Sequence, residues 1–529
     1  MQSLASSAVA RLVILGSATL GGLGLAMFAG RAVAQGEYSL VAMIAGALLG
    51  VTIFLWIGRS AYIFLAIATG LTGSIGILPL PFSYQELMIF GCFAITIAHL
   101  AFKKIQLEGR KTILDLIVWL NLLYIASVFL RNPVGFRALG SEMVGGRPYL
   151  SVIVAALFFF AISQYKIPAK LAPRFPLILA APVLILTSVA AAAFFVPAIG
   201  TVVYPFWTGV GLGRGTIEAV GGTTGPAAKV LRVPTSQIGI TLALLLCAYY
   251  PVSRIISPMS PRSFLLFGVA LVGWLASGFR SGILVIGSYL FYNSWLRRRL
   301  QDLIPLTLVG IIMLAIVVVG QGTLFNLPLG MQRALSFIPG NWHPEAASDA
   351  TASTEWRLEI WREVWTNKEF IKDRWFGDGF GFSAYDLKIQ VDALLGWGGY
   401  LDGSQAQMIT GAYHNGPLST IRYVGVAGLI LYFFLQLTLL TYSAKLVRRA
   451  WGTPFQALTL YLAVPQLYAF LSFYIVFGGY DSDFPRSLFT AGLLKITDLS
   501  LRDYQARSRA TVPPVETITA TPAPANARA

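Results

Sequence analysis

The sequence predicts an all-α polytopic membrane protein with about 13–14 transmembrane helices and one large, partly helical loop between two of them. Of its 529 residues, 56% are hydrophobic and 12% are charged, whereas soluble domains have about 25% charged residues. The mean hydropathy is +0.69. Both cysteines, Cys92 and Cys247, lie inside apolar runs, so neither a disulfide framework nor a cysteine metal site is indicated.

Apolar runs long enough to cross a bilayer recur along the chain, and each predicts one helix. The predicted spans lie near residues 10–29, 38–57, 61–78, 84–101, 113–130, 149–164, 176–199, 236–250, 263–279, 281–296, 303–320, 417–440 and 455–477. A shorter run at 486–499 is either a fourteenth span or an interfacial helix.

The connectors between these runs predict the orientation of the chain. Connectors on one side carry 16 lysines and arginines, and the short loops on the other side carry about nine. The main basic connectors are "KKIQLEGRK" (103–111), "KIPAKLAPR" (166–174), "RRRLQD" (297–302) and "AKLVRRA" (444–450). By the positive-inside rule this side is cytoplasmic, which also places the N-terminus inside and residues 321–416 outside. The net charge of +16 then reflects topology and contact with anionic lipid headgroups, not nucleic-acid binding.

The two ends of the chain raise separate questions. The stretch "RAVAQ" (31–35) contains a signal-peptidase-like pattern, but the apolar run before it is long for a signal peptide, so an uncleaved first span is favoured. The stretch 511–529 is rich in proline, alanine and threonine, which predicts a disordered cytoplasmic tail. The predicted regions are N-terminal membrane helices (1–200), central membrane helices (200–320), the large outer loop (321–416), C-terminal membrane helices (417–500) and the tail region (501–529).

The large loop, residues 321–416, concentrates the polar chemistry. It holds 11 of the 23 acidic residues and two of the three histidines, and loops of this length are usually functional. Within it, "STEWRLEIWREVW" (353–365) predicts a helix with one apolar stripe, formed by Trp356, Ile360, Trp361, Val364 and Trp365. Arg357 falls in the middle of that stripe, so it needs an anionic partner or an aromatic stack, unless it snorkels past tryptophans lying on the membrane surface. Both interpretations stay open.

Two further features of the outer side are rich in glycine. The stretch "DRWFGDGFGFSAYD" (373–386) is either a turn whose backbone approaches a sugar or an ordinary glycine turn. The stretch "WLASGFRSGILVIG" (274–287) joins two spans almost without a loop and places Arg280 at the outer tip, where it is either a solvated hairpin charge or a ligand for an anion.

The outer loop at about 200–235 carries Arg214, Lys229 and Arg232 among many glycines. Glycine-rich backbone can bind phosphate oxygens through its N–H groups, although no Walker signature is present. A flexible outer loop is the alternative.

His414 lies where the large loop enters the next apolar run, in "GAYHNGPLSTIRYVGVAG" (411–428). Gly416 and Pro417 predict a helix start there, with Pro417 at the first helical position. His414 and Asn415 are therefore expected at the outer mouth of a span. Histidine is the side chain best suited to accept a proton near neutral pH.

These motifs resemble those of the O-antigen ligase and O-antigen polymerase superfamily. "YHNGPLSTIRYVGVAGLILYFF" is similar to its His-Asn segment, "SGFRSGILV" to its arginine hairpin, and "RLEIWREVW…DRWFGDGFGFS" to its Arg-x-x-x-Trp helix and Gly-x-Gly turn. The likeness covers roughly residues 200–445. The family often has Pro-Asn before a central span, where this chain has Pro234-Thr235, so Arg232 and Arg214 both remain candidates for the arginine of that motif; Arg232 is nearer the span.

The resemblance implies a GT-C-like glycosyltransferase of the bacterial inner membrane whose active site faces the periplasm and whose termini are both cytoplasmic. The implied donor is a glycan on undecaprenyl diphosphate, and the implied acceptor is a hydroxyl of a glycan or a lipid. His414 would act as the general base and Asn415 or Tyr413 would orient it or the acceptor. Arg280, Arg232, Arg357 and Arg214 would bind the diphosphate. No carboxylate-rich cluster is evident in the sequence, so neither a metal nor another cofactor is expected.

Three functions remain open at this point: a ligase, a polymerase of repeat units with the same chemistry, and a flippase or exporter of lipid-linked glycans. Transporters tend to place ionisable groups at the membrane midplane, often within repeats. This chain places them at one surface, which disfavours the third function. Nothing in the sequence separates the first two.

Overall fold

The computed structural model describes residues 60–77, 82–103, 112–134, 145–210, 233–382 and 413–510, together with the isolated residues Gly30, Ala34, Ile105, Met408 and Gly411. The chain divides into two compact units, Met1–Ala61 and Tyr62–Ala529. Nearly all the described residues belong to the second unit. In this part of the chain all regular elements are helical, and the only β-type pairings are two isolated bridges, Ser74 with Ser83 and Gln321 with Phe325.

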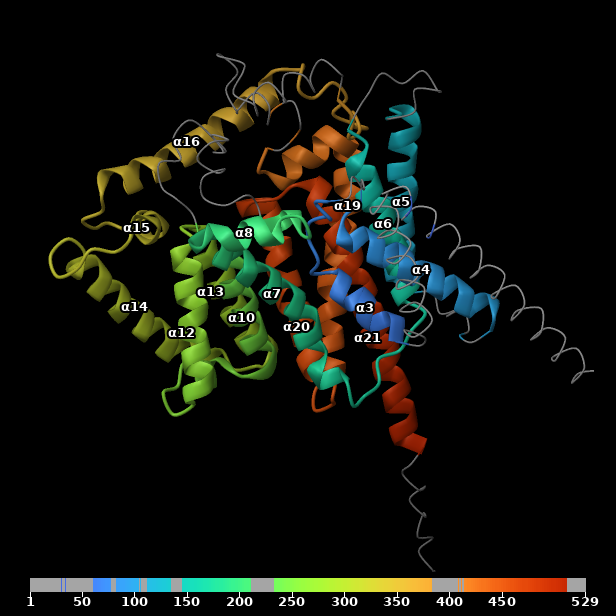
Figure 1. Cartoon of the computed structure of the whole chain (residues 1–529), viewed down its shortest axis with the longest axis horizontal. Coiled ribbons are helices and arrows are strands. Elements are labelled where there is room, and N and C mark those ends of the chain that lie inside the picture. The colour runs from blue at the N-terminus through green and yellow to red at the C-terminus, as the bar shows by residue number, and fades with distance from the viewer. Residues whose placement is uncertain are drawn as a thin grey trace, which may run out of the picture. The chain divides into compact units, whose positions relative to one another are not determined.

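Figure 1 shows the helices of the second unit gathered into a bundle. They are α3 (Ala61–Ala68), α4 (Tyr84–Ala101), α5 (Ile113–Arg131), α6 (Arg147–Ile162), α7 (Phe175–Phe195), α8 (Pro197–Val203), α10 (Ser236–Tyr249), α11 (Val252–Ile255), α12 (Pro261–Ala276), α13 (Ser281–Leu296), α14 (Leu303–Gly320), α15 (Leu329–Leu335), α16 (Pro344–Thr366), α19 (Gly416–Ala450), α20 (Gln456–Leu471) and α21 (Tyr480–Ala510).

The described residues contain six helical segments that are long and apolar enough to cross a membrane. They are Tyr84–Ala101, Ile113–Arg131, Ala172–Phe195, Leu300–Gly320, Gly416–Ala450 and Gln456–Val476. Three shorter apolar helices, α6, α10 and α12, coincide with further predicted spans. The prediction of an all-α, multi-pass membrane protein is therefore confirmed at this level. The predicted spans at 10–29 and 38–57 lie outside the described residues.

The predicted span at 61–78 is wrong, because helix α3 ends at Ala68. The chain then turns, and residues 72–77 bond to the segment after α8: Ile77 N donates to Pro205 O at 2.9 Å, and Thr208 N donates to Ser74 O at 3.0 Å. Gly70 packs so closely on α7 that an added Cβ would lie 2.8 Å from the ring of Pro182. The apolar run with its interspersed glycines predicts one helix, whereas its second half bonds to a segment distant in the sequence.

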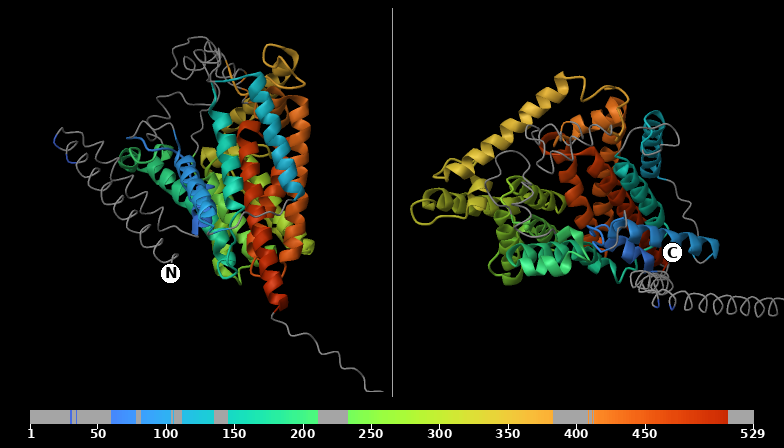
Figure 2. Two further views of the ribbon diagram at one scale, coloured as in Figure 1. Left: turned by 90° about the vertical axis from the view of Figure 1, so that its right-hand side faces the viewer. Right: turned by 45° about the horizontal axis from the view of Figure 1, so that its top comes forward.

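Two C-terminal helices are longer than predicted. Helix α19 continues to Ala450, so "AKLVRRA" is its last two turns and not a connector. Helix α21 starts at Tyr480 and ends at Ala510, ten residues into the predicted tail region. Residues 511–529 lie outside the described residues. Figure 2 shows α5, α19 and α21 running side by side, in agreement with the contacts of α19 with both partners.

Local signals explain where the N-terminal helices begin. Ser83 and Glu86 form a reciprocal capping box at the start of α4, and Thr112 and Asp115 form another at the start of α5. Asp115 also forms a buried ion pair with Lys495 of α21. The carboxylate that begins α5 therefore also ties it to α21.

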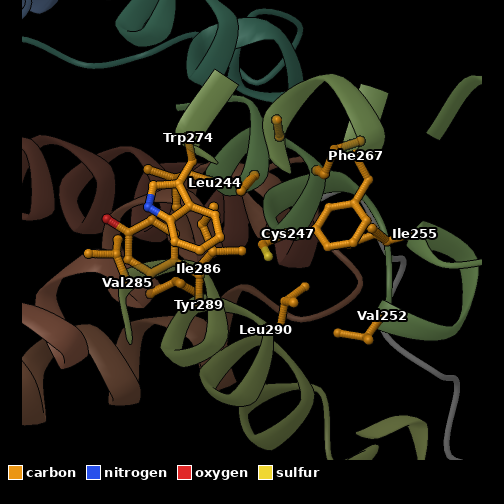
Figure 3. Packing of buried hydrophobic residues seen from close by; sticks show 14 residues of the cluster. Leu244, Cys247, Val252, Ile255, Phe267, Trp274, Val285, Ile286, Tyr289 and Leu290 are labelled. Carbon is orange, nitrogen blue, oxygen red and sulfur yellow. The ribbon is translucent and has the colours of Figure 1, made fainter. Parts of the chain in front are cut away.

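A dense core joins the central helices, and Figure 3 shows the rings of Trp274, Phe267 and Tyr289 gathered around Cys247. These residues come from α10, α12 and α13; α10 packs on α12, on α13 and on α20, and α13 also packs on α20. Gly282 makes this packing possible, because an added Cβ would lie 1.8 Å from Nε1 of Trp274. The hairpin between α12 and α13 is thus held in place by buried apolar contacts.

Candidate functional site

The start of α19 fixes the backbone of the His-Asn pair. Helix α19 begins at Gly416, so Pro417 is its second residue, one position later than predicted. Asn415 is the N-cap, and its side-chain oxygen accepts a hydrogen bond from Leu418 N at 3.0 Å. The Asn415 side-chain oxygen is therefore engaged in capping α19, directly after His414 in the chain.

His414 has a left-handed backbone, with φ of 54°. This conformation is uncommon for residues other than glycine, although histidine adopts it more often than most, and residues in it cluster at functional sites. The imidazole stacks on Phe477, with ring centroids 4.9 Å apart and an angle of 26° between the planes. Trp356 of α16 lies 6.0 Å from it on a tilted plane. The ring is held between an aromatic residue that precedes α21 and one from the large loop.

The surroundings of His414 favour its neutral form. Burial lowers the pKa of His414 below its usual range, and the positive charge of Arg357 lowers it further. A neutral imidazole at physiological pH can accept a proton, as a general base must. The electrostatics of the position are therefore those that a base requires.

Helix α16 lies across the start of α19. Ile360 and Val364 are buried against Leu418 and Ile421. The indole of Trp361 donates to Tyr413 O at 2.7 Å. The predicted apolar stripe is thus confirmed, and it packs on the protein itself. Trp365, also predicted in the stripe, is 50% exposed and carries Arg374 at 4.7 Å from its ring.

Arg357 is half-buried on this face, and its Nε is buried without a hydrogen-bond partner among the described residues. Burial lowers the pKa of Arg357, and the nearby charge of Arg333 lowers it further. A buried guanidinium beside another cation is unfavourable unless an anion completes the site. Of the two interpretations of Arg357, this geometry favours a partner that is anionic and comes from outside the described chain.

Arg280 reaches the same helix from the hairpin between α12 and α13. The turn depends on Gly278, which has a φ of 71°. The Nη2 atom of Arg280 donates to Thr354 Oγ1 at 3.2 Å. Thr354 lies on α16 one turn before Arg357. Arg280 therefore contacts the turn of α16 next to the turn that carries Arg357. Figure 1 shows this hairpin, α15 and α16 at the same end of the unit.

Arg333 is a site residue that the sequence analysis missed. It lies on α15, is only 4% exposed, and donates through Nη1 to Gly278 O at 2.8 Å. It thereby fixes the turn that carries Arg280 and also adds positive charge next to Arg357. The available signal was an arginine in the apolar stretch "LGMQRALSF", which predicts a buried charge with a specific task.

The glycine-aromatic turn, in its segment 373–379, stabilises α19 by backbone hydrogen bonds. Gly425 interrupts α19 with φ of 70° and ψ of −179°. The segment 373–379 inserts there and satisfies the backbone groups that the break releases. Its four bonds are Asp378 N to Arg422 O (3.0 Å), Gly379 N to Tyr423 O (2.9 Å), Val426 N to Arg374 O (2.9 Å) and Ala427 N to Trp375 O (3.1 Å). Of the two interpretations, an ordinary structural turn is the one that this arrangement favours.

A partly buried ion pair lies near Tyr413. Arg422 of α19 forms an ion pair with Asp378 of the inserted turn, with 3.1 Å between Nη1 and Oδ2. The Tyr413 hydroxyl is buried with no hydrogen-bond partner in the described part of the chain, and burial raises its pKa. At neutral pH this hydroxyl therefore keeps its proton. The Tyr413 side chain packs with Ile360 and Leu418 in the apolar contact between α16 and the start of α19.

Other predicted residues fall outside this description. Arg214 and Arg232 lie outside the described residues, so their relation to the cluster stays a prediction. Within the described ranges there is no group of three or more histidine, cysteine, aspartate or glutamate residues suited to a metal ion. The expectation of a metal-independent reaction is untested.

The structure thus brings together His414, Arg357, Arg280 and Arg333, here named the His-Arg cluster. Its four members come from the start of α19, from α16, from the α12–α13 hairpin and from α15. Comparison with models of known protein families gave no match, and comparison with curated proteins gave none either.

Proposed function

We propose that this multi-pass membrane protein is a glycosyltransferase that moves a glycan from a polyprenyl diphosphate to an acceptor hydroxyl, as O-antigen ligases do. The observation that carries the proposal is the His-Arg cluster. It combines a histidine whose pKa is lowered by burial and by Arg357 with a guanidinium whose buried Nε lacks a partner among the described residues.

The proposed reaction needs both halves of this cluster. Neutral His414 takes the proton of the acceptor hydroxyl while the hydroxyl oxygen attacks the anomeric carbon. The bond between that carbon and the diphosphate oxygen breaks, the configuration inverts, and the diphosphate leaves with the bonding electrons. Guanidinium groups match phosphate oxygens in a bidentate manner, so Arg357 and Arg280 would stabilise the developing charge. Arg333 would support them by holding the hairpin.

The proposed location follows from the charge distribution along the sequence. The positive-inside rule predicts that the side with the basic connectors is cytoplasmic, so the cluster would face the periplasm of a bacterial inner membrane. A donor on that side must arrive on a lipid, because no nucleotide pool exists there. A polymerase would use the same cluster. Deletion of the gene distinguishes the two functions, since loss of a ligase leaves long chains on the carrier and loss of a polymerase leaves single repeats still transferred.

The substitution Arg280→Lys tests the diphosphate assignment. Lysine keeps the charge but replaces a planar fork with a hydrated point charge. We expect normal expression, a loss of transfer on the order of 10²-fold, and accumulation of the lipid-linked donor. Arg362→Lys is the matched control, because Arg362 is exposed on the opposite face of α16. Full activity of Arg280→Lys with purified donor would reduce Arg280 to a hairpin charge and remove it from the site.

A further inference from the structure

A pocket of about 440 Å³ lies far from the His-Arg cluster, between the C-terminal ends of α13 and α19. Trp295, Leu296 and Leu300 form its apolar wall. Arg298 and Arg448 supply its charge. Helix α13 starts next to Arg280 and runs 16 residues to this end, so the pocket and the cluster lie about 24 Å apart along the helix axis. The pocket is independent of the proposed reaction.

The two arginines of this pocket differ from their sequence neighbours. Arg297 points its guanidinium inward, to Asn293 Oδ1 at 2.7 Å and to backbone oxygens of α10. Arg449 forms an ion pair with the buried Asp498. Among the described residues, no carboxylate forms an ion pair with Arg298 or Arg448, and both are exposed.

The nearest acidic residue is also engaged elsewhere. Asp302 is buried, and its carboxylate accepts a hydrogen bond from Ser253 Oγ at 2.9 Å. No acidic residue lines the pocket. The positive charge of the pocket is therefore not neutralised by the part of the chain that the structure describes.

The backbone at Arg298 is unusual. It has a φ of 56°, and the next amide, Arg299 N, closes the helix end by donating to Ser294 O at 2.8 Å. Glycine or asparagine normally occupies the left-handed position that ends a helix. Arginine there costs conformational free energy that glycine would not cost. A left-handed arginine on the rim of a pocket indicates a task for its side chain.

An exposed apolar surface continues from the pocket toward the middle of the two helices. Phe291, one turn before Trp295 on α13, is 47% exposed. Leu437, two turns before the pocket residue Ala444 on α19, is 37% exposed. A ligand with an anionic head in the pocket and apolar chains along these residues would match both surfaces.

We propose that this pocket binds an anionic glycerophospholipid, with its phosphate between Arg298 and Arg448 and its acyl chains along Phe291 and Leu437. Trp295 lies at the level of the headgroup, where tryptophan is enriched in membrane proteins. Basic pockets between transmembrane helices bind anionic lipid headgroups in this way.

The test uses the full-length chain in phosphatidylcholine vesicles with increasing fractions of brominated phosphatidylglycerol. Bromine quenches nearby tryptophans, and the difference between the wild type and Trp295→Phe isolates Trp295 among the 12 tryptophans. Each arginine near an anionic surface contributes about 1 kcal/mol, so two arginines predict a preference of about 25-fold over brominated phosphatidylcholine. The double substitution Arg298→Gln with Arg448→Gln should abolish the preference for brominated phosphatidylglycerol. This variant is also measured with and without Trp295→Phe.

The matched control is Arg174→Gln with Arg262→Gln, which removes the same charge from two exposed arginines of other basic connectors. This control should keep the preference for phosphatidylglycerol. Equal quenching by the two brominated lipids, or an unchanged preference in the Arg298 and Arg448 double variant, would overturn the proposal. Loss of the preference on adding inorganic phosphate would also overturn it, since it would show a site for free phosphate.

Discussion

His414 combines three local properties of its backbone, its ring and its charge state. Its backbone is left-handed, its ring is stacked on Phe477, and burial together with Arg357 lowers its pKa. A strained residue persists only where the surrounding structure over-determines it. Here Asn415 caps the next helix and the Tyr413 carbonyl binds Trp361, so the backbone on both sides of His414 is fixed.

The substitution His414→Asn separates the chemistry from the strain. Asparagine tolerates the left-handed region better than alanine does, so folding and membrane insertion should be preserved. Asparagine cannot accept a proton, so transfer should fall by on the order of 10²–10⁴-fold. Glycan transfer in membrane extracts and the thermal stability of the purified variant check the two halves. Near-normal transfer would remove His414 from the mechanism.

The charge of Arg357 should set part of the pH dependence. A positive neighbour disfavours protonation of His414, so the acid limb of the rate profile should lie below the usual histidine range of about 6.5. Removing that charge with Arg357→Met raises the pKa of His414. As the pH is lowered, His414 then becomes protonated at a higher pH than in the wild type, so the acid limb of the rate profile moves to higher pH.

The measurement is the pH profile of transfer for each variant, normalised to its own maximum, because Arg357→Met should also weaken donor binding. The matched control, Arg362→Met, removes an exposed charge from the opposite face of α16 and should leave the limb in place. An acid limb that does not move in Arg357→Met would mean that the two groups do not interact in the working enzyme.

At the scale of elements, the break in α19 determines how the large loop attaches to the membrane helices. The inserted segment 373–379 replaces four backbone hydrogen bonds around Gly425. Tyr124 of α5 adds a hydrogen bond to Val424 O at 2.8 Å. Because the loop inserts into α19 a few turns below His414, it locks α16 and the start of α19 into one body.

The substitution Gly425→Ala should disrupt the insertion of segment 373–379 into α19. An added Cβ would lie 2.2 Å from Trp375 O, and φ of 70° disfavours any side chain. We expect a loss of about 2–4 kcal/mol in the free energy of unfolding, measured as a lower melting temperature in detergent. Gly268→Ala in α12 is the control, because its Cβ would meet nothing within 4 Å. Unchanged stability of Gly425→Ala would show that the insertion is not rigid.

At the scale of the whole molecule, α13 and α19 each run from the His-Arg cluster toward the basic pocket. One end holds a histidine and partly buried arginines, and the other end holds exposed arginines. Only 6% of the apolar segment that contains α14 is buried inside the protein, so most of the surface of this helix is available to lipid. These features fit a bundle that crosses a bilayer with the two sites on opposite faces.

Cysteine labelling tests this arrangement. Ser348 is exposed on α16 and Arg299 is exposed beyond α13. In intact spheroplasts, Ser348→Cys should react with an impermeant maleimide, and Arg299→Cys should react only after lysis. The natural cysteines, Cys92 and Cys247, are both buried and should give little background. The reverse pattern would invert the topology and place the His-Arg cluster on the cytoplasmic side.

The sequence by itself determined where most of the described helices lie, because hydropathy and helical periodicity report on local burial, but not the end of α3 or the full lengths of α19 and α21. The runs at 84–101 and 113–130 coincide with α4 and α5 to within one residue, and the apolar stripe of α16 was visible in its spacing. His414 and Arg280 stood out as polar groups at the ends of apolar runs, and Arg357 stood out as a charge in the middle of an apolar stripe.

Only the tertiary structure decided which of these groups meet. The contact of Arg280 with Thr354 joins residues 74 positions apart, and the bond from Arg333 to Gly278 joins residues 55 positions apart. The break at Gly425 was hidden, because glycine is common in membrane helices and the apolar run continues past it. Such pairings depend on how helices pack, and packing is a property of the whole bundle that no local window of sequence contains.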